Sequence, residues 1–183
     1  MATQRQSSAV DALRVLLFLA LVSSVSVRNV AAQDAERPSF AGEITKQVLF
    51  DPTTYAPAII AYDATVRDWN TSQLFFRNGF LERNPRFTIS GFPYDRPLSY
   101  DAGHRRIAVD ALTNLGSSVV HNVTERTLER MLIKRYPERH TLVRTLGWVE
   151  RVAFGATMSY VLSSAHYRQA NFNQARASEL GLR

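Results

Sequence analysis

Apolar residues in the C-terminal half of the chain recur at intervals of three and four residues. This is the period of an α-helix, whereas a half-buried strand alternates every second residue. From Ile107 to Met131 an apolar residue or a threonine returns every four positions. Asp101 can cap the start of such a helix, and the residue before Pro137 is disfavoured in helical geometry. The pattern therefore predicts one long helix between Asp101 and Pro137.

Another helix with the same period is expected earlier, over about residues 55–78. Pro57 is favourable in its first turn, because the N–H groups of that turn form no hydrogen bond within the helix and proline has none to donate. Gly79 can end the helix in the left-handed conformation. The residues that follow, 80–100, contain three prolines, and they are expected to form a loop.

A third helix is expected to open at Pro137 and to end at about Arg168. The three segments predict an all-α fold, an irregular bundle of three long helices with a proline-rich loop between the first and second. Residues 53–168 then form the helical domain. Residues 33–52 are expected to be a partly disordered N-terminal segment, and residues 169–183 a polar C-terminal tail.

Residues 1–32 have the layout of a secretory signal peptide. Arg5 and Arg14 precede an uncharged, largely apolar run at residues 15–27, and small residues follow before Gln33. Signal peptides have these regions in this order, so cleavage is expected before Gln33. The apolar run is shorter than the roughly 17–25 residues of a membrane-spanning helix. The alternative is that the segment is retained as an N-terminal anchor.

The basic residues are mostly arginine, because only Lys46 and Lys134 among the 22 are lysines. Removal of residues 1–32 would lower the formal net charge from +6 to +4. An exported protein does not meet cytoplasmic nucleic acid, so an envelope component or an anionic lipid surface is the expected partner. The expected location is periplasmic or attached to the membrane.

Thiol chemistry is excluded because the chain has no cysteine. Disulfide frameworks, thiolate-bound zinc, iron–sulfur clusters and cysteine nucleophiles all require one. The serine-nucleophile patterns GxSxG and SxxK and the glycine-rich phosphate loop are also missing from the sequence. No cofactor is expected, and the sequence favours a non-enzymatic protein.

One group of residues has the types and spacing of metal ligands: His121, Glu125 and Glu129. Side chains four residues apart lie along one stripe of a helix, and the remaining ligands would come from another helix. This group predicts a metal-dependent enzyme as an alternative function. The other interpretation is a solvated charged stripe that pairs with neighbouring arginines.

Basic residues form a parallel stripe around the end of the same helix, at Arg126, Arg130, Lys134, Arg135 and Arg139. Clustered basic side chains of this kind attract anionic lipid headgroups. Glutamates are interspersed among them, so the alternative is a helix surface whose charges are neutralised locally.

Small residues recur every four positions in the third helix, at Gly155, Ser159 and Ser163, within the uncharged stretch 152–165. Small residues at this spacing let two helices approach closely. They predict helix–helix self-association through these three residues. The stretch itself is interpreted either as buried core or as a membrane-embedded or interfacial helix pair.

Polar residues flank the turn that ends the first long helix. Asp68 and Thr71 precede the turn, and Glu82 and Asn84 follow it. Because Asn84 precedes a proline, the chain is expected to leave the turn in an extended conformation. We expect these four residues to form a polar cluster that joins the helix to the loop, or a binding pocket.

The same region resembles a pattern found in small uncharacterised bacterial helical proteins, which are usually membrane-associated. The pattern D-x-x-T-[ST] followed by G-x-x-E-x-N-P is matched by Asp68, Thr71, Ser72, Gly79, Glu82, Asn84 and Pro85. The resemblance covers about residues 55–85, with a weaker echo at residues 165–167. It implies a helical architecture and carries no activity.

These features favour a non-enzymatic exported envelope protein that acts by binding or scaffolding. One alternative is a metal-dependent enzyme that uses His121, Glu125 and Glu129. The other is a small integral membrane protein that keeps its N-terminal anchor.

Overall fold

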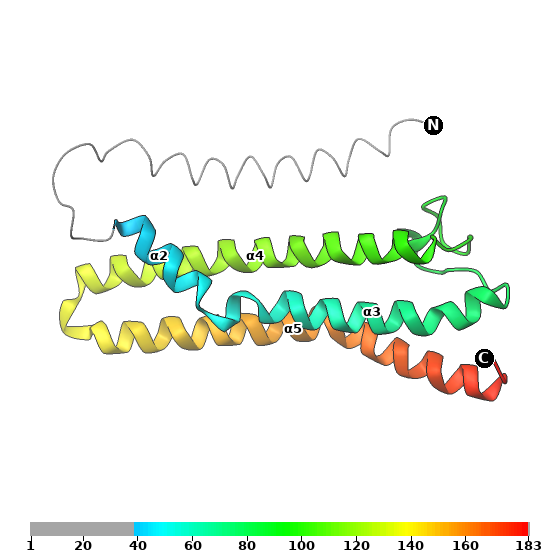
Figure 1. The fold of residues 1–183 in the computed structure, drawn as a ribbon. Helices are drawn as coiled ribbons and strands as arrows, with labels where there is room; N and C mark the ends of the chain where they lie inside the picture. Colours follow the sequence, from blue (N-terminus) through cyan, green and yellow to red (C-terminus); the bar gives the residue numbers. More distant parts are fainter. Residues whose placement is uncertain (1–38, 183) are drawn as a thin grey trace. The chain divides into compact units, whose positions relative to one another are not determined.

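The computed structural model describes residues 39–182, and within them the protein is all-α, as predicted. These residues contain four α-helices, shown in Figure 1: α2 (Phe40–Leu49), α3 (Ala56–Arg77), α4 (Tyr100–Arg135) and α5 (His140–Glu179). Three short 3-10 turns separate them: η1 (Pro52–Thr54), η2 (Pro85–Phe87) and η3 (Pro137–Arg139). Three long helices were expected, and α2 is a fourth, shorter one.

The expected signal peptide, residues 1–32, lies outside the described residues, as does the beginning of the segment 33–52. The rest of that segment is ordered, because α2 occupies most of it and buries Ile44 and Val48. The chain divides into two compact units, residues 1–43 and residues 44–183. Helices α3, α4 and α5 belong to the second unit, which is described below.

The ends of α4 and α3 follow the sequence signals closely. The N-cap of α4 is Ser99, whose hydroxyl accepts the N–H of Ala102, so the expected cap Asp101 instead lies in the first helical turn. The helix stops at Arg135, shortly before Pro137. After α3, Gly79 adopts a φ of +82°, the left-handed conformation that was expected to end this helix.

Helix α5 extends to Glu179, well past the end expected at about Arg168. Most of the expected polar tail 169–183 is therefore helical. The periodicity that marks a buried face continues there, because Ala170, Asn173 and Ala177 are all buried. The polar residues between these three obscure the pattern in the sequence.

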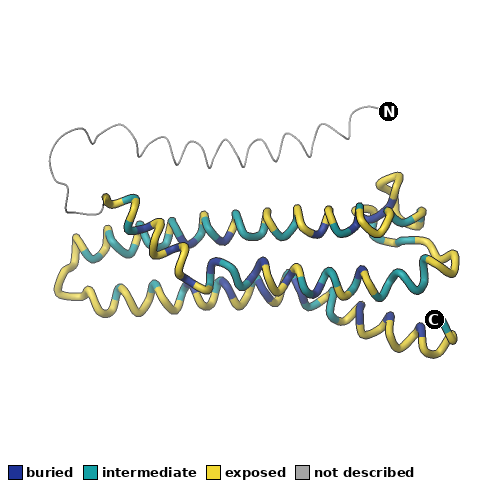
Figure 2. Tube along the Cα trace, viewed as in Figure 1, coloured by how far each residue is buried: buried dark blue, intermediate teal, exposed yellow. Residues whose placement is uncertain are grey.

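Helices α3 and α5 meet along faces made of small residues. Helix α3 buries Ala58, Ala61 and Ala64, and α5 buries Gly155, Ser159 and Ser163. Figure 2 shows buried positions along the sides where these two helices face each other. The hydroxyls of Ser159 and Ser163 bond to carbonyls four residues earlier in α5. The small residues of α5 are thus buried within the chain, and self-association through them stays a prediction.

A cluster of apolar side chains fixes the end of α3 against the start of α4. Trp69, Phe87 and Ile107 form its buried centre. The Trp69 ring lies so close to the backbone of α4 that a Cβ atom on Gly103 would be 2.2 Å from it. The indole N–H also donates to the carbonyl of Tyr100 at 3.3 Å. Gly103 is therefore required by the close approach of the ring.

Four charged side chains meet where η1 contacts α4 and α5: Asp51 and Arg151 are buried, and Arg126 and Glu129 are half-buried. Arg151 donates through Nη1 to Glu129 at 3.0 Å and through Nε to Asp51 at 3.2 Å. Arg126 donates to the same Asp51 oxygen at 2.8 Å. Beside them, the amide of Asn122 donates to the hydroxyls of the two η1 threonines. The network joins three segments that are far apart in the sequence.

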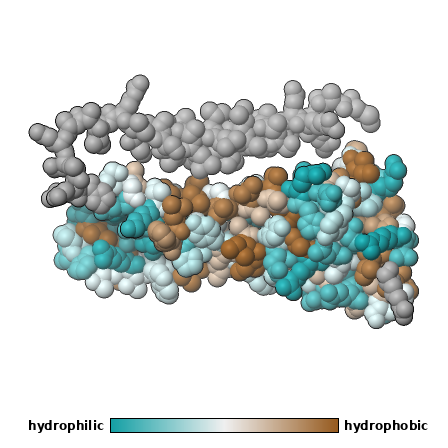
Figure 3. Space-filling model, viewed as in Figure 1, coloured by the Kyte–Doolittle hydropathy of each residue, from teal (hydrophilic) through white to brown (hydrophobic). Residues whose placement is uncertain are grey.

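Many large apolar side chains remain exposed on the second unit, and brown patches mark such residues in Figure 3. They include Leu112 and Met131 on α4 and Leu142, Leu146 and Tyr160 on α5. Within residues 39–182, no helix combines the length and the apolar character that crossing a membrane requires.

Candidate binding cleft

A cavity of about 560 Å³ lies between the C-terminal half of α3, the loop that follows it and the last turns of α5. Its apolar wall includes six aromatic rings: Trp69, Phe75, Phe76, Phe80, Phe87 and Phe172. Its polar groups include five side chains that approach from all three segments: Asp68, Glu82, Asn84, His166 and Asn173. The cavity is thus mainly apolar, with a few polar groups gathered in it.

The carboxylate of Asp68, on α3, is held by two residues of α5. Its Oδ2 atom lies 2.7 Å from Nδ1 of His166, and its Oδ1 atom lies 3.4 Å from Nδ2 of Asn173. The Asn173 amide is also within hydrogen-bond distance of the hydroxyls of Thr71 and Ser72. Gln169 donates to the Oδ1 atom of Asn173 at 2.8 Å. These contacts fix the polar side chains before any ligand binds.

Glu82 is positioned by the loop. Its main chain pairs with that of Asp95, with N–H to carbonyl distances of 2.9 and 3.2 Å in the two directions. Its carboxylate accepts the N–H of Asn84 at 2.7 Å. Burial raises the pKa of Glu82 above its ordinary value, and the negative charge of Asp68 adds to this effect, although main-chain hydrogen bonds oppose it. The cleft therefore contains a half-buried carboxyl group whose charged form is disfavoured.

A smaller cavity of about 220 Å³ lies among α3, α4 and α5 next to the first. Thr65, Asn84, Phe87 and His166 line both cavities. His166 thus stands between the two spaces, in contact with Asp68.

Three of the four residues of the predicted polar cluster lie at this cleft. Asp68, Glu82 and Asn84 line the cavity. Thr71 does not line it, but its hydroxyl lies within hydrogen-bond distance of the lining residue Asn173. Sequence reasoning missed Asn173 because the end of this helix was expected near Arg168, and it did not connect His166, which lies within the expected helix, with the cluster. The available signal was the spacing of three and four residues that continues from position 163 through positions 166, 170, 173 and 177.

The predicted metal ligands do not converge. Glu129 accepts from Arg151, while Nε2 of His121 lies 3.2 Å from Glu150 and its ring stacks on Phe154 at 3.5 Å between centroids. Burial raises the pKa of Glu125, and the charge of Glu150 adds to this effect. Within residues 39–182, no three His, Asp or Glu side chains are placed to share a metal ion.

The basic stripe is not a single surface. Arg126 points inward to Asp51 and Glu129, so it is not available to lipid headgroups. Arg135 lies over the Tyr136 ring at 5.7 Å from its centroid, and Arg139 lies 3.9 Å from Glu138. Of the five basic residues, Lys134, Arg135 and Arg139 are exposed, and Arg130 is partly buried and has a partner.

Comparisons of the chain with protein-family models, curated proteins and solved structures found no significant match. The cleft and its polar residues are therefore the basis on which a function is assigned.

Proposed function

We propose that this chain is a non-enzymatic binding protein of the cell envelope that holds a small, mainly apolar ligand in the cleft. The observation that supports this most directly is the cavity of about 560 Å³ with its aromatic wall. Small-molecule sites are typically concave, about 300–1,000 Å³ in volume, and mostly apolar with a few fixed polar groups. The cleft has these properties.

The polar residues of the cleft support recognition rather than a reaction. Asp68 already interacts with His166 and Asn173, and the Asn173 amide interacts with two hydroxyls of α3. Polar groups held in this way present a fixed pattern to a ligand and lose little conformational freedom when it binds. Such preorganisation favours affinity and specificity.

The envelope location rests on the pattern of residues 1–32, from which a periplasmic or membrane-attached protein is expected. The test is fractionation of cells that express the full chain, together with N-terminal sequencing of the product. A product that begins at Gln33 and is found in the envelope fraction supports export. A product that retains its first residues and is found in the cytosol contradicts it.

Binding can be measured with N-phenyl-1-naphthylamine, a neutral apolar dye whose fluorescence increases away from water. We expect saturable binding of one dye molecule per chain. The variant Ser72→Phe places a ring in the cavity, where Ser72 is a lining residue, and it should weaken binding at least tenfold.

The matched control is Ser117→Phe, because Ser117 is exposed on α4 and its hydroxyl bonds to a carbonyl of its own helix. This variant should bind the dye as the unmodified chain does. Equal binding by both variants would show that the dye adheres to the exposed apolar surface, and the proposed binding cleft would be rejected.

A further inference from the structure

The cleft contains two carboxylates that have different hydrogen-bond partners. Asp68 has His166 at 2.7 Å. Glu82 accepts main-chain N–H groups of Asn84 and Arg83, and within residues 39–182 no basic side chain forms an ion pair with it. In its ionised form Glu82 is therefore a negative group in a mainly apolar cavity, with no basic side chain paired to it among the described residues.

The two arginines that line the cavity are engaged outside it. Arg83 lies over the ring of Tyr94, 5.5 Å from its centroid, and its Nη2 atom is 3.4 Å from the Tyr94 hydroxyl. Arg176 donates to Glu179 at 2.8 Å. Neither Tyr94 nor Glu179 lines the cavity. Both guanidinium groups are thus engaged by partners that lie outside the cavity lining.

The remaining wall is rich in aromatic rings. The faces of such rings carry partial negative charge, which attracts cations, and the attraction strengthens where water is excluded. An ionised carboxylate in a cavity lined by aromatic rings therefore favours a cation that has lost part of its hydration shell. An anion in the same cavity would be repelled by the ionised carboxylate of Glu82.

We propose that the ligand of this cleft is an organic cation, with an ammonium group against Glu82 and the aromatic rings and an apolar body in the rest of the cavity. The inference rests on the proposed function, because it specifies the chemical class of the ligand for the same site. Glu82 provides charge recognition, the rings provide both apolar and cation–π contact, and the Asp68–His166 pair bounds the site on the side of α5.

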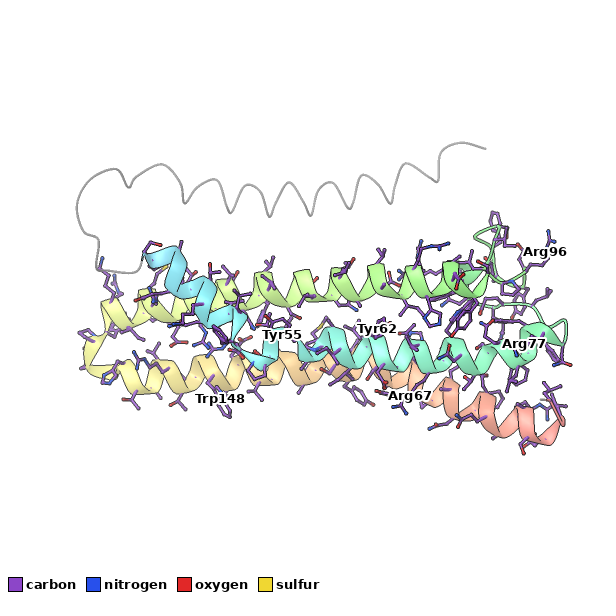
Figure 4. All side chains as sticks on the ribbon, in the orientation of Figure 1. Tyr55, Tyr62, Arg67, Arg77, Arg96 and Trp148 are labelled. Atoms are coloured by element: carbon purple, nitrogen blue, oxygen red, sulfur yellow. The ribbon has the colours of Figure 1, made fainter. Side chains whose placement is uncertain are left out.

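The test compares three soluble compounds of similar size that differ in charge: 2-phenylethylammonium, 2-phenylethanol and phenylacetate. Binding is followed by the emission of Trp69, which lines the cavity and is 3% exposed. The chain has two tryptophans, and the other, Trp148, is 59% exposed and projects outward from α5 (Figure 4). The variant Trp148→Phe leaves Trp69 as the single reporter.

The expected result is that 2-phenylethylammonium binds at least tenfold more tightly than 2-phenylethanol and that phenylacetate binds most weakly. In Glu82→Gln the preference for the cation over the alcohol should fall to threefold or less. The amide oxygen can still accept the Asn84 N–H, so the loop is expected to keep its conformation. Glu138→Gln, which changes an exposed carboxylate outside the cavity, should retain the full preference.

Other outcomes separate the two proposals. Equal affinity for the three compounds, or tightest binding of phenylacetate, would overturn the inference and leave the proposed binding function intact. The inference is also overturned if the cation fails to bind while the neutral dye still binds in the cleft. If neither the dye nor any of the three compounds binds there, the proposed function itself fails. These comparisons use the unmodified carboxylates, so they do not depend on how Glu82→Gln folds.

Discussion

Arg151 of α5 donates through Nε to the carboxylate of Asp51, a residue 100 positions earlier in the chain, at a distance of 3.2 Å. The Arg151 side chain is 2% exposed. Burial by itself would raise the pKa of Asp51, but hydrogen bonds from Thr53 and Arg126 outweigh it, so the pKa lies below its ordinary value. The carboxylate thus stays charged in the buried network, and it joins η1 to α4 and α5.

Replacement of Arg151 should be strongly destabilising. Arg151→Leu leaves Asp51 and Glu129 partly buried with one positive partner fewer, and we expect a loss of about 3 kcal/mol in the free energy of unfolding. The matched control is Arg144→Leu on the exposed side of α5, which should change stability by less than about 0.5 kcal/mol. Urea denaturation of both variants measures the difference. Similar midpoints for the two would contradict a structural role for the buried network.

Two glycines of α4 should respond in opposite directions to the same change. Gly103→Ala forces a Cβ atom against the Trp69 ring, and we expect a loss of about 1–3 kcal/mol from overpacking. Gly116→Ala meets no atom within 4 Å and should gain about 0.5–1 kcal/mol, because alanine is the better helix former. Thermal unfolding followed by circular dichroism distinguishes them. A gain in both variants would mean that Trp69 does not lie against α4.

Glu82 should make stability depend on pH. Its folded-state pKa is raised above the ordinary value of 4.5, so the folded protein holds this proton more tightly than the unfolded chain does. The resulting stabilisation is fully present below pH 4.5 and is lost as pH rises through the folded pKa. Glu82→Gln cannot ionise, so it does not lose this stabilisation as pH rises. The free energy of unfolding of the variant minus that of the unmodified chain should therefore be larger at pH 8 than at pH 4.

The measurement is the difference in urea midpoint between Glu82→Gln and the unmodified chain at the two pH values. Glu138→Gln serves as the control because Glu138 is exposed. The difference in urea midpoint between this variant and the unmodified chain should be the same at pH 4 and pH 8. A relative stability of Glu82→Gln that decreases from pH 4 to pH 8 would show that the folded state favours the charged form of Glu82.

Asn173 should be essential for holding the end of α5 against α3 at the cleft. Asn173→Leu removes the amide that faces Asp68, Thr71 and Ser72, and we expect a loss of about 1–3 kcal/mol. Asn171→Leu makes the same change at an exposed position of the same helix and should be close to neutral. Amide hydrogen exchange in the last turns of α5 should accelerate in the first variant alone. Unchanged exchange in both would contradict the bridging role of Asn173.

The sequence predicted those parts of the fold and the cleft that depend on neighbouring residues. The period of α4, its stop before Pro137 and the left-handed Gly79 are local effects, and the structure agrees with each. Asp68 and Glu82, which the sequence also grouped, both line the cleft, and only a helix end and a short turn separate them.

The sequence failed where distant residues decide the outcome. His166 and Asn173 reach Asp68 across about 100 positions. Their contribution requires the packing of α5 on α3, which no short-range pattern encodes. Arg126 was expected on a basic surface for the same reason, since the Asp51 carboxylate that pairs with it is 75 residues away.

The sequence by itself determined that this chain is all-α and where most of its helices begin and end, because helical hydrogen bonds and caps join residues only a few positions apart. Tertiary structure alone decided, within residues 39–182, which arginine is buried beside Asp51, which glycine lies against the Trp69 ring and which polar residues meet in the cleft. These outcomes depend on which charged groups and which bulky side chains are buried between helices. The side chains involved come into contact only after the helices have packed together.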